Sequence, residues 1–123
     1  MSIAARAMGA LTNQKMVSDE QIHEALETLR KTAIEIGMAR QRMILATEMV
    51  KHIEALMMVA SDERSADMRK ASARASEKYK KAIEEEAAAG RAYETLKAVR
   101  EHAVSITEAW RTQESTLRSI KIG

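Results

Sequence analysis

Apolar residues recur at every seventh position along two long stretches of the chain. One series runs over 22–57 and the other over 75–117, and every member of both is apolar. A repeat of seven keeps one side of an α-helix facing the same partner over its whole length. The pattern therefore predicts two long helices packed along a continuous seam. The seam positions are Ile22, Leu29, Ile36, Met43, Val50 and Met57, followed by Ala75, Ala82, Ala89, Leu96, Ala103, Trp110 and Leu117.

Two serine-led runs predict where these helices begin. Ser18 opens the run Ser-Asp-Glu-Gln, a capping-box pattern in which the serine hydroxyl accepts from a free amide and Gln21 reaches back. The first helix is therefore expected from about residue 19 to residue 60. Ser61 opens a similar acidic run, which predicts a chain reversal near 60–66. A second helix is then expected over 63–118, and whether Gly90 breaks it stays open.

The composition favours an all-α fold. The chain has no proline, phenylalanine or cysteine and only four glycines among its 123 residues, as is typical of long helices with few interruptions. We expect an elongated, coiled-coil-like antiparallel helical hairpin over 18–123 that assembles into a helical bundle. Helical spacing of apolar residues also predicts a short N-terminal amphipathic helix, which with its linker occupies 1–17.

The apolar surface of the first predicted helix is wider than one stripe. A single partner helix covers only one stripe, so this width predicts self-association, most simply as a homo-dimer. The alternative is that its methionines form an adaptable surface for a helix of another protein. Trp110 extends beyond the reach of the shorter first helix and is a candidate anchor at an interface. The candidate interface residues are Met43, Met49, Val50, Ile53, Met57, Leu96, Trp110 and Leu117.

No pattern predicts catalysis, a metal site, a cofactor or a small-molecule substrate. Glu20 and His23 have the spacing of one half of a di-iron motif, but the second copy of that motif is missing. The glycine loops that bind phosphate are also missing. No segment has the roughly 18 uncharged residues that a membrane span needs, so we expect a cytoplasmic, non-enzymatic protein without a membrane partner.

The net charge of +2 conceals a basic stretch over 68–82. On one continuous helix, Lys70, Arg74, Lys78 and Lys81 would form a stripe that could follow a phosphate backbone. Solvation or pairing with acids of the other arm explains the same charges, and the chain has few aromatic residues on which bases could stack. Nucleic-acid binding therefore stays an alternative. Its candidate residues are Arg69, Lys70, Arg74, Lys78, Tyr79 and Lys81.

Four stretches of the C-terminal third share a distinctive helical texture: Lys78-Tyr79, Arg91-Ala92-Tyr93-Glu94, Lys97-Ala98-Val99-Arg100 and Ala109-Trp110-Arg111-Thr112-Gln113. On these residues, roughly 75–118 resembles the small all-helical accessory proteins of bacteriophages and prophages. The resemblance implies a virus-encoded accessory protein or inhibitor that binds a host protein in the host cytoplasm, or nucleic acid during recombination or replication. It implies no catalytic residue. A structural component of a larger helical assembly is a further alternative.

Overall fold

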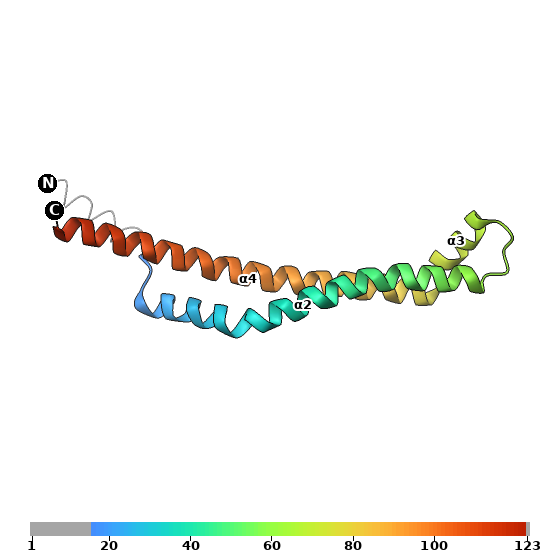
Figure 1. Cartoon of the computed structure of the whole chain (residues 1–123), viewed down its shortest axis with the longest axis horizontal. Helices are drawn as coiled ribbons and strands as arrows, with labels where there is room; N and C mark the ends of the chain where they lie inside the picture. Colours follow the sequence, from blue (N-terminus) through green and yellow to red (C-terminus); the bar gives the residue numbers. More distant parts are fainter. Residues whose placement is uncertain (1–15, 123) are drawn as a thin grey trace. The chain divides into compact units, whose positions relative to one another are not determined.

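The computed structural model describes residues 16–122, and these residues form three α-helices without any strand. Helix α2 spans Asp19–Ala60, α3 spans Ala66–Arg74 and α4 spans Glu77–Ile122 (Figure 1). The all-α class and the hairpin of two long helices are therefore confirmed. The short helix expected near the N-terminus falls outside the described residues.

The capping box predicted at the start of α2 is present. The Gln21 backbone N–H donates to Ser18 Oγ at 3.1 Å, and the Ser18 backbone N–H donates to Gln21 Oε1 at 2.9 Å. Asp19 and Glu20 lie in the first turn, where negative charge is favoured by the helix dipole. Two otherwise unpaired amides are thus satisfied by a reciprocal pair, which fixes the first residue of the helix.

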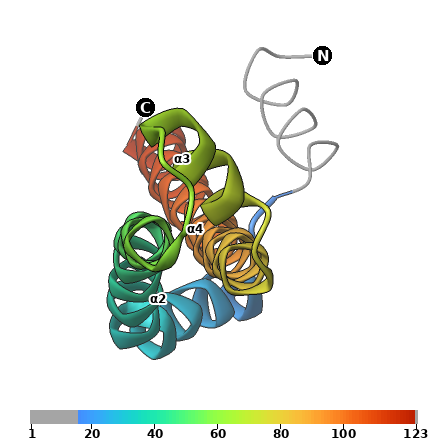
Figure 2. The same ribbon diagram turned by 90° about the vertical axis from the view of Figure 1, so that its right-hand side faces the viewer.

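The single helix expected over 63–118 is instead divided in two, and this expectation was wrong. Ser65, and not Ser61, caps α3 by accepting from the Met68 N–H at 3.1 Å. Ser76 then starts α4, because its Oγ accepts from the Tyr79 N–H at 3.2 Å and donates to the Ala73 carbonyl at 2.7 Å. Figures 1 and 2 show that α3 does not continue the line of α4. Helix α4 passes through Gly90 without a break.

The described residues divide into two compact units. Unit 1 comprises residues 16–33 and 98–122, and unit 2 comprises residues 34–97. Both long helices contribute to both units. In each unit α2 and α4 run antiparallel, since residues early in one helix contact residues late in the other.

Unit 1 is held by a small apolar core and by polar contacts between its helices. Ile22, Ala25 and Ala103 are buried. Arg100 Nη1 donates to the Leu29 carbonyl at 2.8 Å and to Thr32 Oγ1 at 2.7 Å. Just before α2 begins, the Val17 backbone N–H donates to Gln113 Oε1 at 2.9 Å, and Gln113 Nε2 donates to the Val17 carbonyl at 3.0 Å.

Unit 2 has a core of alanines. Ala46, Ala73 and Ala89 are buried, at 4%, 1% and 0% exposure. Side chains this small let helix backbones approach closely, but they leave little volume to cover the larger residues beside them. Ion pairs fix the register of the unit, with Arg42 bonded to Glu85 and Arg74 bonded to Glu54.

The predicted seam is confirmed. Every seam position is buried or half-buried except Ala75, which is exposed because it lies at the break between α3 and α4.

Candidate interaction surface

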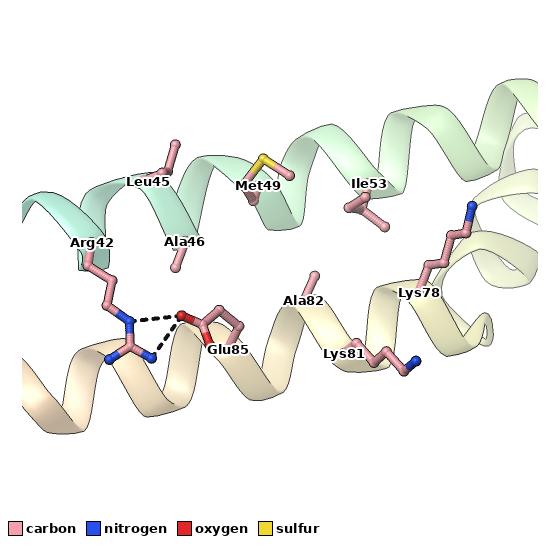
Figure 3. A pocket seen from close by; sticks show the side chains of 9 residues that line it. All are labelled: Arg42, Leu45, Ala46, Met49, Ile53, Lys78, Lys81, Ala82 and Glu85. Carbon is pink, nitrogen blue, oxygen red and sulfur yellow. Dashed lines mark hydrogen bonds and ion pairs between the residues drawn. The ribbon is translucent and has the colours of Figure 1, made fainter.

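An open groove runs between α2 and α4 of unit 2, with a volume of about 390 Å³. The groove is lined from α2 by Arg42, Leu45, Ala46, Met49 and Ile53, and from α4 by Lys78, Lys81, Ala82 and Glu85 (Figure 3). The α2 wall is thus mainly apolar and the α4 wall mainly charged.

The groove exists because of where small residues stand in the sequence. Alanines occupy the facing positions of both helices, so the contact between the helices is closed without any large side chain filling the space beside it. The larger residues of α2, such as Leu45 and Met49, lie on the neighbouring face of the helix and not at the positions that face α4. Leu45 and Met49 therefore remain 61% and 41% exposed.

These exposed residues belong to a longer series that we call the α2 stripe. It consists of positions 38, 42, 45, 49, 52, 56 and 59, which alternate in steps of four and three. Such spacing places them on one side of the helix, next to the seam. Five members are large and apolar and two are polar: Met38, Leu45, Met49, Leu56 and Val59 are 65%, 61%, 41%, 47% and 85% exposed, and Arg42 and His52 are also exposed.

Most of the interface residues predicted on α2 lie on the inner seam. Met43, Val50 and Met57 are half-buried within the hairpin, Ile53 is half-buried in the groove wall, and only Met49 is exposed. The apolar side chains that the hairpin does leave accessible, such as Met38 and Leu45, were not among the predicted site residues. A second apolar series beside the seam was the signal that would have identified them.

The candidate residues on α4 are partly covered as well. Leu96 and Leu117 are half-buried. Trp110 is half-buried in unit 1, beside a hollow of about 280 Å³ that Arg111, Glu114 and Arg118 also line. The Trp110 indole Nε1 is buried and has no hydrogen-bond partner among the described residues.

The predicted basic stripe does not lie on one helix. Arg69 and Lys70 are on α3, whereas Lys78 and Lys81 are on α4 beyond the break, in the groove wall. Arg74 is paired with Glu54 at 3.2 Å. Tyr79 is half-buried, so its ring does not stand free as a stacking platform. The continuous helical face on which phosphate binding was argued is therefore missing.

Two of the charges beside the groove, Arg42 and Glu85, are paired with each other. Arg42 Nε donates to Glu85 Oε1 at 2.9 Å, and Nη2 lies 2.9 Å from the same oxygen. This hydrogen bond lowers the pKa of the Glu85 carboxyl and raises the pKa of the Arg42 guanidinium. Arg30 lowers the pKa of Glu27 in the same way on the surface of unit 1.

Unit 1 has a second groove of about 540 Å³, with a different character. Its α2 wall is largely polar, with Gln21, Glu24 and Thr28, and its α4 wall includes Val99 and Ile106. Neither wall matches the run of large apolar residues found on α2 in unit 2.

Within residues 16–122, no group of three or more potential ligand side chains is placed to hold a metal ion. None of the described helices is long and apolar enough to cross a membrane. Comparisons of the chain with protein-family models, with curated proteins and with solved structures find no match.

Proposed function

We propose that this chain is a non-enzymatic protein-interaction module whose α2 stripe packs against a helix of another polypeptide. The observation that carries the proposal is the exposure of five large apolar side chains in helical register, between 41% and 85%. Contiguous apolar surface of this kind marks interaction sites more often than ordinary surface. A repeat in steps of four and three is matched by a partner helix lying alongside it.

Burial of the α2 stripe favours binding. Covering the exposed part of each of its five apolar side chains contributes about 1 kcal/mol, since full burial of such a residue contributes about 1.5–3 kcal/mol. Association costs at least about 4 kcal/mol in lost freedom of motion. The stripe alone therefore does little more than offset that cost, and the net affinity depends on the contact area that the groove adds for the same partner helix.

The biological partner that we propose is a host protein, as for the phage accessory proteins that the C-terminal third resembles. The chain would act by occupying a helix-binding surface of that host protein, which requires no chemistry of its own. The stripe contains two methionines, Met38 and Met49, which suit such a role because unbranched, polarizable side chains adapt to uneven partner surfaces.

Affinity capture with two matched variants tests this proposal. Leu45→Lys places a charge in the α2 stripe, whereas Ile44→Lys places the same charge on the neighbouring residue, which is 52% exposed and lies off the stripe. Tagged wild type and Ile44→Lys should recover the same protein from a bacterial lysate. With the purified partner, Leu45→Lys should bind at least about tenfold more weakly.

Circular dichroism of both variants is the control, and we expect both to keep their helices. Equal binding of the partner by Leu45→Lys and Ile44→Lys, or the absence of any recovered partner, would overturn the proposal.

A further inference from the structure

Six of the seven positions of the α2 stripe are arranged symmetrically about Thr47, and Val59 lies outside this symmetric set. Counting outward from Thr47, the apolar pair Leu45 and Met49 comes first, the polar pair Arg42 and His52 follows, and the apolar pair Met38 and Leu56 is outermost. Each member of a pair lies at the same distance from position 47 on opposite sides. Such symmetry has no function within a single hairpin, but it is what a two-fold axis requires of a surface that meets its own copy.

We infer that the α2 stripe binds a second copy of this chain, with the two α2 helices antiparallel about a two-fold axis at Thr47. This inference rests on the interaction function proposed above, and because the second copy occupies the same stripe, a host helix would bind there by displacing it. In this arrangement Leu45 meets Met49 of the second copy, and Met38 meets Leu56 of the second copy. Each of the four apolar residues at these six positions then faces an apolar residue of the second copy.

The charges favour this antiparallel arrangement over a parallel one in register. A parallel dimer would place Arg42 opposite Arg42 and Lys78 opposite Lys78, and like charges at an interface cost free energy. The antiparallel dimer places Arg42 opposite His52 instead. Glu48 approaches its own copy near the axis, but its carboxylate is already paired with Lys51 at 3.2 Å.

The space beside the axis also suits a second helix. Ala46 borders the α2 stripe on the side of α4 and is only 4% exposed, so nothing bulky projects there. The open groove between α2 and α4 receives the side chains of the second copy. The methylene stems of Lys78 and Lys81 can cover that contact while their ammonium groups stay in water.

Thiol cross-linking of the full chain tests the arrangement, because the sequence contains no cysteine. Gln41 and Ala55 are exposed residues on the solvent-facing border of the α2 stripe, at similar distances from its centre. The antiparallel dimer brings Gln41→Cys of one copy beside Ala55→Cys of the other. It separates each position from its own copy by about 20 Å, at 1.5 Å per residue.

We expect a mixture of the two cysteine variants to be joined by a short bismaleimide several-fold faster than either variant alone. Glu48→Cys, close to the axis, should link with itself and is the positive control. Faster linking of each variant with itself than with the other would overturn the antiparallel dimer, and so would the absence of any linking.

The test separates this inference from the proposed function. If cross-linking fails while Leu45→Lys still abolishes binding of a host protein, the dimer is wrong and the interaction function stands. If the antiparallel cross-link forms but Leu45→Lys and Ile44→Lys bind the host protein equally, the dimer stands and the host interaction is wrong.

Discussion

Polar side chains that satisfy backbone groups determine where the helices of unit 1 begin and where they meet. Ser18 and Gln21 form a capping box that is visible in the sequence, because both partners stand within three residues. The pairing of the Gln113 amide with Val17 joins residues 96 positions apart, so no local pattern indicates it. The sequence likewise contains no local signal that Arg100 joins the two helices through its hydrogen bonds.

Arg100→Ala should lower the free energy of unfolding. Its guanidinium donates to the Leu29 carbonyl and to Thr32 Oγ1 in a half-buried setting, and hydrogen bonds from a charged donor contribute about 1.5–3 kcal/mol. Urea unfolding at fixed protein concentration measures the change. Arg91→Ala, at an exposed arginine of the same helix, is the control and should change stability by less than about 0.5 kcal/mol. Equal effects of the two substitutions would contradict the role of Arg100.

Glu85→Gln should lower the thermal midpoint slightly at neutral pH but not in acid. The hydrogen bond from Arg42 lowers the pKa of Glu85 below its ordinary value of 4.5, so the folded state favours the carboxylate. Stability from this pair is present above the unfolded pKa and is lost as the pH falls through the lowered folded pKa. Thermal unfolding of wild type and variant should therefore differ at pH 7 and converge as the pH falls below 4.5 through the lowered pKa of Glu85. A difference that stays constant into acid, where the carboxyl is protonated, would show that Glu85 acts through packing.

At the scale of the elements, periodicity predicted the long helices well and the break between α3 and α4 poorly. The seven-residue series located α2 and most of α4, because burial at one face constrains every turn. The break at Ala75–Ser76 lies among alanines, which favour an unbroken helix. Ser76 followed by Glu77 was its only local signal, and it resembles Ser18 followed by Asp19.

Ser76→Ala should destabilise the protein by about 1 kcal/mol, the usual contribution of a serine N-cap. The substitution removes the acceptor of the Tyr79 N–H and the donor to the Ala73 carbonyl. Urea unfolding measures the loss, with Ser72→Ala on the exposed face of α3 as the control. A neutral or stabilising effect of Ser76→Ala would mean that an unbroken helix across this position is equally stable.

Gly90→Ala should stabilise the protein by about 0.5–1 kcal/mol, because alanine lowers the entropy of the unfolded chain and favours the helix. A Cβ built at Gly90 meets no other atom within 4 Å, so the substitution introduces no clash. Gly37→Ala, at an equally unobstructed position of α2, should give a gain of similar size. A decrease in the free energy of unfolding at Gly90 would show that the second copy or another partner approaches its backbone.

At the scale of the whole molecule, the two hydrophobic patterns of α2 serve different purposes. The seam closes the hairpin, and the α2 stripe stays accessible because the alanine core cannot cover it. The sequence predicted self-association from the width of this apolar surface. The interface residues that it named on α2, apart from Met49, are half-buried within the hairpin, because seam and stripe differ by a rotation about the helix that only the position of α4 resolves.

Sedimentation equilibrium of the full chain tests the central claim most directly. At micromolar concentration, we predict that the measured molar mass of wild type and of Ile44→Lys is twice the 13.7 kDa of one chain. Leu45→Lys should have the mass of a monomer and keep its helices. A monomeric wild type, a large polymer, or equal masses for the two lysine variants would contradict the claim that the α2 stripe joins two copies of the chain.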